Sequence, residues 1–159
     1  VINLMGQYGM PTVENPFNWA KKLVTNLQEQ NIKNIFLDFH AEVTSEKRIM
    51  LMMFKNQISA ICGTHTHVGT DDLQIFENTA YLTDIGLTGC RDNVIGMDSK
   101  IPIQKVTTGI GGHFEVPNSC KSILQMLVVD IDDGKASSAF KIKKYCNNSK
   151  LFITEAFID

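Results

Sequence analysis

Several features that would assign this 159-residue sequence to a common class of protein are missing from it. It has no run of about 20 apolar residues, so it predicts no membrane-spanning helix. Its first residues lack the basic flank and the small-residue cleavage site of a secretory signal peptide. The formal net charge of −2 leaves no basic excess of the kind that holds nucleic acid through its phosphates. A nucleotide substrate would therefore have to be held by local contacts.

Frequent catalytic and phosphate-binding motifs are also absent. The sequence contains no Gly-x-Ser-x-Gly elbow, no phosphate-binding glycine loop ending in Lys-Ser or Lys-Thr, and no Gly-x-Gly-x-x-Gly. The hydrophobic content of 43% and the charged content of 20% are ordinary for a globular protein. The length suffices for one domain with its own core, so we expect a single domain over residues 1–159.

The four cysteines are widely spaced and form no Cys-x-x-Cys pair. They lie at Cys62, Cys90, Cys120 and Cys146. This spacing argues against a zinc ribbon and against a thioredoxin-like redox motif. It is typical of reduced thiols, and we therefore expect a cytoplasmic protein.

The first 65 residues alternate between strand and helix patterns. Short apolar runs predict strands at residues 1–5, 32–39 and 58–62, and helical spacing predicts helices at residues 15–30 and 44–55. This alternation is typical of an α/β layered fold. Because the sequence opens directly in a strand-like run without a methionine, we expect it to begin inside a larger fold.

The remaining residues have a pattern rich in β-strands. A hairpin is predicted at residues 73–83, and a short helix at residues 98–107. Further strands are predicted at residues 113–116, 122–130 and 137–145, and a turn at residues 132–135 joins the last two.

Three of the four histidines follow the ends of predicted strands. His65 and His67 are one residue apart, and in an extended segment both side chains would lie on the same side. A parallel strand that ends at His40 would bring a third imidazole to the same edge. Neutral imidazole binds zinc, iron, manganese and nickel, so the pattern predicts metal ligands. An incidental His-x-His pair is the alternative, and we interpret His113 as an ordinary histidine.

A site for two metal ions would also need oxygen ligands. The candidates are Asp38, Glu42, Glu46, Asp71, Asp72 and Asp84. None of them has convincing ligand spacing on its own. Asp84 and Glu42 could support a histidine by a hydrogen bond. Asp84 could equally be an exposed turn residue, and Glu42 could belong to the start of a helix, where an acidic side chain suits the helix dipole.

Three sequence blocks, taken together, resemble one protein family. The blocks are Asp38-Phe39-His40-Ala41-Glu42 within residues 36–47, Gly63-Thr64-His65-Thr66-His67-Val68, and Thr83-Asp84-Ile85-Gly86 within residues 79–89. In this order they resemble the C-terminal part of the YmdB family. That family is a branch of the calcineurin-like metallophosphoesterases and is associated with hydrolysis of 2′,3′-cyclic nucleotides.

The resemblance implies an α/β/β/α sandwich with two transition-metal ions, iron, manganese or zinc, at the strand ends. It implies that His40 and His65 ligate one ion and His67 the other, and that the substrate is a small nucleotide or another phosphodiester. On this resemblance, residues 1–159 are the C-terminal half of the domain, and the missing N-terminal half carries the general acid and the remaining ligands.

Two alternatives stay open at this point. The chain could be a non-catalytic remnant or an interaction module of the same fold. It could also be a mononuclear zinc hydrolase that uses His40, His65 and His67. The sequence does not decide whether the protein is a homo-oligomer.

Overall fold

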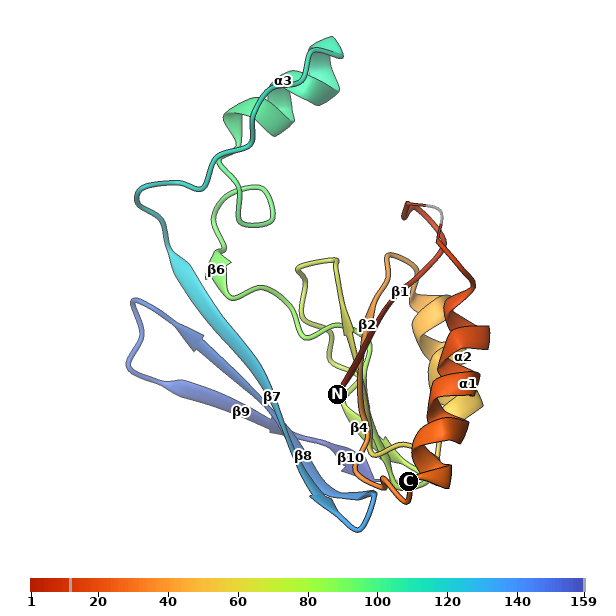
Figure 1. Cartoon of the computed structure of the whole chain (residues 1–159). Coiled ribbons are helices and arrows are strands. Elements are labelled where there is room, and N and C mark those ends of the chain that lie inside the picture. The colour runs from red at the N-terminus through yellow and green to blue at the C-terminus, as the bar shows by residue number, and fades with distance from the viewer. Residues whose placement is uncertain (12, 159) are drawn as a thin grey trace.

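The computed structural model describes residues 1–11 and 13–158, and its larger sheet brings strand ends together at one edge (Figure 1). The strand order is β1-β2-β3-β5-β4-β10. The bounds are β1 (Ile2–Met5), β2 (Phe36–His40), β3 (Ala60–Thr64), β4 (Gln74–Phe76), β5 (Thr79–Leu82) and β10 (Phe157–Ile158). Because β1, β2, β3 and β5 run parallel, their carboxyl ends share one edge of the sheet.

Two helices cover one face of this sheet (Figure 1). They are α1 (Pro16–Glu29) and α2 (Thr44–Phe54). The predicted start of the first helix is confirmed, because the Asn15 side chain accepts hydrogen bonds from the first-turn backbone and proline takes the first helical position. Val24 and Leu51 from the helices pack with Phe39 and other strand residues into one buried cluster.

A smaller sheet covers the opposite face, in the order β6-β7-β8-β9. The bounds are β6 (Gly89–Cys90), β7 (Ser122–Asp132), β8 (Lys135–Tyr145) and β9 (Leu151–Glu155). Ala136 and Ala139 pack with Ala80 and Leu82 of the larger sheet in a second buried cluster. The described residues therefore form helix, sheet and sheet layers, three of the four layers expected. No helix in this part of the chain is long and apolar enough to cross a membrane.

Several details of the predicted elements are wrong. The strand expected at residues 113–116 is an exposed coil, since no neighbouring strand pairs with it among the described residues. The strand expected at residues 32–39 begins only at Phe36. The strands β9 and β10 were not expected, because they pair with distant segments whose approach no local pattern reveals. The helix α3 (Lys100–Thr108) lies close to its prediction and extends away from both sheets (Figure 1).

The expectation of four reduced cysteines is also wrong. Cys90 and Cys120 form a disulfide with a Cα–Cα distance of 5.5 Å, across the base of the loop that holds α3. The cause is the pairing of β6 with β7, which sets Cys90 opposite Ser122 and so close to Cys120. Of the other two, Cys62 is buried and Cys146 is exposed. The cysteine spacing therefore no longer supports a cytoplasmic location.

Candidate metal centre

The pleat of β2 decides which of its side chains can reach the strand ends. Leu37 and Phe39 face the helices, so Asp38 and His40 project from the opposite face of the sheet. The parallel register sets His40 beside Thr64 at the end of β3. His65 follows directly, so the two predicted ligands meet at the carboxyl edge as expected.

A chain of hydrogen bonds fixes the orientation of His40. The Thr64 hydroxyl donates to Asp38 Oδ1 at 2.9 Å and lies 3.1 Å from His40 Nδ1. Because the single hydroxyl proton goes to Asp38, we assign the proton of this ring to Nδ1, which donates to Thr64 Oγ1. His40 Nε2 then carries the lone pair, and it lies 3.0 Å from His65 Nδ1. A carboxylate that orients a ligating histidine in this way is a common support of metal sites.

Glu42 lies on the other side of His65. Its Oε2 is 3.0 Å from His65 Nε2, and the side chains of Glu42 and His65 are 55% and 33% exposed. Both nitrogens of His65 thus face hydrogen-bond acceptors. A contact this exposed to solvent contributes little stability. Glu42 thus contacts a histidine, and its role as a supporting residue of a metal site stays a prediction.

His67 does not join the other two histidines. Its Nδ1 donates to the Ile95 carbonyl oxygen at 2.7 Å. The expectation that His65 and His67 lie on the same side of an extended segment is wrong, because β3 ends at Thr64 and the backbone then turns. The φ angles are 110° at His65 and 63° at His67, and residues other than glycine rarely adopt positive φ angles. Within residues 1–11 and 13–158, no three His, Cys, Asp or Glu side chains are grouped to hold an ion.

Asp84 supports the backbone between the histidines and touches neither ring. Its Oδ2 accepts the Thr66 N–H at 3.0 Å and lies 2.9 Å from Lys47 Nζ, while Oδ1 accepts the Gly86 N–H at 2.9 Å. The side chains of Asp84 and Lys47 are each 1% exposed. The alternative of an exposed turn residue is therefore wrong.

Lys47 is the functional candidate that the sequence reasoning missed. It precedes the buried residues Met50, Leu51 and Phe54 by three, four and seven positions, so it lies on the same face of α2. If charged residues had been included in the helical periodicity, the pattern would have predicted that Lys47 lies on the buried face of the helix. A lysine at a buried position requires a partner, and that requirement was the available signal.

The other acidic candidates lie away from the histidines and have other contacts. Glu46 is buried and accepts the backbone N–H groups of Gln7 and Tyr8, which holds the loop after β1. Asp72 accepts hydrogen bonds from Thr70 and Thr83. Asp71 lines a separate small cavity. His113 lies in the exposed coil, in agreement with its interpretation as an ordinary histidine.

The electrostatic environment favours a neutral His40. Burial, and next the neighbouring charge of His65, lower the pKa of His40 below its ordinary value. The neutral imidazole is the form that ligates a metal. Burial raises the pKa of the nearby Cys62 thiol to about 12, so Cys62 stays protonated near neutral pH and is no ready ligand.

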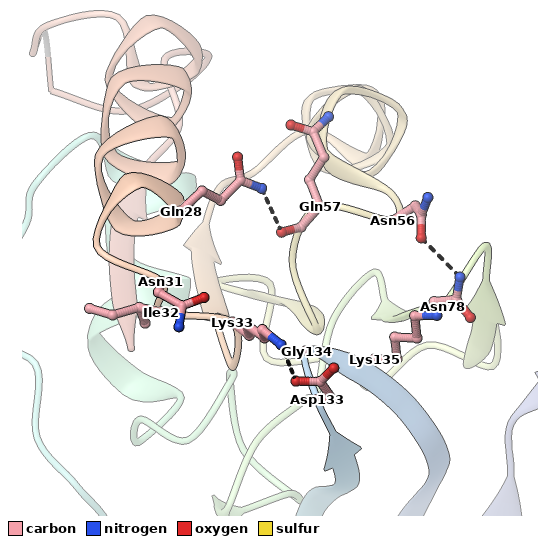
Figure 2. A pocket seen from close by; sticks show the side chains of 10 residues that line it. All are labelled: Gln28, Asn31, Ile32, Lys33, Asn56, Gln57, Asn78, Asp133, Gly134 and Lys135. Carbon is pink, nitrogen blue, oxygen red and sulfur yellow. Dashed lines mark hydrogen bonds and ion pairs between the residues drawn. The ribbon is translucent and has the colours of Figure 1, made fainter.

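A polar cavity of about 200 Å³ lies at the other end of the parallel strands (Figure 2). Its lining includes Lys33 before β2, Asn56 before β3 and Asn78 before β5, so it opens at the amino ends of the strands. The side-chain oxygen of Asn56 accepts a hydrogen bond from the Asn78 amide (Figure 2). The cavity is formed by turns and is separate from the histidines.

Comparisons with known proteins agree with this architecture. The chain belongs to the YmdB-like protein family, whose model matches residues 1–144. Over 149 residues it is 40% identical to the 2′,3′-cyclic-nucleotide 2′-phosphodiesterase of Bacillus subtilis (strain 168), covering 93% of this chain and 55% of the relative. The resemblance to the YmdB family is thereby confirmed.

Two crystal structures are similar over almost the whole chain. A hypothetical protein from Thermus thermophilus superposes with a TM-score of 0.79 at 25% identity, covering 97% of this chain and 56% of the other. A novel phosphatase from Mycoplasma pneumoniae superposes with a TM-score of 0.70 at 31% identity, covering 97% of this chain and 52% of the other. The α/β fold class is confirmed, and the chain spans about half the length of these proteins.

Proposed function

We propose that this chain supplies His40, His65 and His67 to the metal centre of a phosphodiesterase. The proposed centre holds two ions of iron, manganese or zinc and acts on 2′,3′-cyclic nucleotides or similar small phosphodiesters. The observation that carries the proposal is the 3.0 Å approach of His40 Nε2 and His65 Nδ1 at neighbouring strand ends. The names of the Bacillus relative and of the Mycoplasma structure support the reaction class.

The donor set fits one side of such a centre. Two imidazole nitrogens converge, and the hydrogen bond from Nδ1 to Thr64 leaves the Nε2 lone pair of His40 available. His40 and His65 would hold one ion, and His67 would hold the other after leaving the Ile95 carbonyl. When bound, the two ions supply charge neutralisation for the transferred phosphoryl group.

The residues of this chain have distinct tasks in that centre. Thr64 and Asp38 hold the His40 ring in one tautomer and one orientation. As a ligand through Nδ1, the nitrogen that faces His40, His65 would have to lose the proton on that nitrogen. Its Nε2–H would remain and could keep donating to Glu42 Oε2, so Glu42 would orient the ring.

We infer that the remaining ligands lie outside residues 1–11 and 13–158. The described residues bring only two histidines together, whereas a centre for two ions needs more donors and a bridging carboxylate. We therefore propose that residues 1–159 belong to one larger metallophosphoesterase domain whose other half carries the general acid. Relatives of about twice the length support this arrangement.

A non-catalytic remnant or interaction module is the second candidate. It is favoured by the position of His67, which is bonded to Ile95 and turned away from the other pair. The same observation weakens the mononuclear zinc hydrolase, which would need all three histidines around one ion.

The test uses the longest polypeptide that contains this chain in its source. Hydrolysis of 2′,3′-cyclic AMP and bound metal are measured in the wild type, His65→Ala and His67→Ala, with His113→Ala as the matched control. We expect each of the first two changes to lower turnover more than about 100-fold, since loss of a supporting partner alone costs roughly 10–100-fold. His113→Ala should retain activity.

Each alternative predicts a different result. Retained activity in both His65→Ala and His67→Ala would exclude the proposed centre. A wild type without metal and without turnover would establish the remnant. One bound ion per active site would support the mononuclear hydrolase.

A further inference from the structure

The buried ion pair of Lys47 and Asp84 lies against the segment that carries two of the three histidines. We propose that this pair is a positioning device that sets the backbone of His65-Thr66-His67 and so determines where both imidazoles point. The inference rests on the proposed function for its purpose, because it assumes that the histidines are ligands. Its evidence is the bonding around Asp84, which is independent of any metal.

The first observation is backbone strain on both sides of one hydrogen bond. His65 and His67 have φ angles of 110° and 63°, and Thr66 lies between them. The N–H of Thr66 donates to Asp84 Oδ2 at 3.0 Å. A positive φ is unfavourable for a bulky side chain and persists only where the surroundings enforce it. The Asp84 carboxylate is the group that holds the strained segment.

The second observation is that this carboxylate is buried and fully bonded. Asp84 receives hydrogen bonds from Lys47, Thr66 and Gly86, and both members of the pair are 1% exposed. A buried charge is tolerated only when it is paired and hydrogen-bonded. Lys47 supplies the opposite charge beside Asp84 and helps to hold the carboxylate against the Thr66 N–H. Lys47 therefore acts on the histidines through Asp84 and the backbone.

The third observation is that the packing leaves no room for a shift. A Cβ atom at Gly63 would overlap the Thr83 carbonyl oxygen and lie 2.8 Å from Lys47 Cδ. The backbone N–H of Ile85 donates to the Gly63 carbonyl at 3.0 Å. The end of β3, the segment after β5 and the first turn of α2 thus meet around the pair. A change in the pair must move the histidine segment.

The test combines metal binding with a measurement that needs no metal. Binding of Co²⁺ to the longest polypeptide that contains this chain in its source, and the visible spectrum of bound Co²⁺, are measured for Asp84→Asn, Lys47→Met and the double variant. Ile35→Ala is the control, because Ile35 is 2% exposed in the core before β2 and lies away from the histidine segment. Hydrogen exchange of the Thr66 amide is measured by NMR without metal.

We expect Asp84→Asn and Lys47→Met to weaken Co²⁺ binding by roughly 10–100-fold and to alter its spectrum. The Thr66 amide should exchange at least about tenfold faster in both. Ile35→Ala should lower stability and leave Co²⁺ affinity within about twofold, at a temperature where circular dichroism reports a folded chain. If either single variant fails to fold, the double variant, which removes both buried charges, gives the same measurements.

Three results would overturn the proposal. One is an unchanged Co²⁺ affinity and spectrum in Asp84→Asn. Another is an equal loss of affinity in Ile35→Ala, which would make the effect one of general stability. The third is unchanged protection of the Thr66 amide in both single variants. If the wild type of that longer polypeptide binds no Co²⁺, the proposed function loses its support, and the Thr66 amide still decides the positioning role.

Discussion

Both ends of the parallel sheet have residues with positive φ angles and an ion pair, but the two ends differ in the residue types and in the burial of the pair. At the amino end, Asn31, Asn56 and Asn78 have φ angles of 60°, 60° and 68°. Asparagine adopts the left-handed region more readily than most residues with a side chain, so these three residues follow local preference. The ion pair at this end, Lys33 with Asp133, is exposed at 52% and 71%.

At the carboxyl end the positive φ angles belong to His65 and His67. The 63° of His67 lies in the left-handed region, which histidine adopts more often than most residues, whereas the 110° of His65 lies outside that region. The ion pair there, Lys47 with Asp84, is 1% exposed on both sides. Tertiary hydrogen bonds thus impose a conformation that the local sequence resists. Such conflict between local preference and tertiary structure gathers at functional sites, which supports the proposal that the site lies at the histidine end.

Breaking the two ion pairs should give the largest contrast. Lys47→Met leaves the buried Asp84 carboxylate without its counter-charge, and we expect a loss of about 3–5 kcal/mol in the free energy of unfolding. Lys33→Met removes an exposed charge and should change the free energy of unfolding by about 1 kcal/mol or less. Urea denaturation of both variants measures the difference. Similar losses in the two variants would mean that burial does not distinguish the pairs.

Adding a methyl group at Gly63 should have the next largest effect on stability. Gly63→Ala sets a methyl group against the Thr83 backbone, far inside van der Waals contact with its carbonyl oxygen. We expect a loss of about 3 kcal/mol, at the upper end for overpacking. Gly111→Ala is the matched control, since a Cβ there meets nothing within 4 Å. Thermal unfolding of both should separate them clearly, and an unchanged midpoint for Gly63→Ala would contradict the close approach.

The sequence was sufficient to bring His40 and His65 together. Parallel strands with short apolar runs put their carboxyl ends at one edge, so histidines that follow the runs must meet there. The position of His67 could not be predicted in the same way. It depends on two backbone angles enforced by Asp84, and Asp84 comes from a distant segment. Local patterns carry no record of such a contact.

Pairings between distant segments were hidden for the same reason. The Cys90–Cys120 disulfide depends on the alignment of β6 with β7 across 30 residues. The edge strands β9 and β10 depend on partners that are far away in the sequence. Helical periodicity, in contrast, could have revealed Lys47, because its position on the buried face of α2 follows from spacing alone.

Glycine and alanine should rank in opposite orders at the two adjoining histidines. At His65, where φ is 110°, glycine relieves the strain, so we expect His65→Gly to be more stable than His65→Ala by about 1–2 kcal/mol. His40 ends an extended strand, where glycine is unfavourable. We therefore expect the free energy of unfolding of His40→Ala to be about 0.5–1 kcal/mol higher than that of His40→Gly. Chemical denaturation of the four variants tests the inversion. The same order at both positions would mean that His65 is not strained.

The smallest contrast concerns the two unpaired cysteines, Cys62 beside the histidine segment and exposed Cys146. Burial raises the pKa of Cys62 from an ordinary value of 9.0 to about 12. Between these values the unfolded thiol ionises while the folded thiol keeps its proton, so stability is present below pH 9 and falls as pH rises. From pH 8 to pH 10 the wild type should lose about 1 kcal/mol more than Cys62→Ala in urea unfolding. Cys146→Ala should lose as much stability from pH 8 to pH 10 as the wild type does. Equal pH dependence in the wild type and in Cys62→Ala would mean that water reaches Cys62.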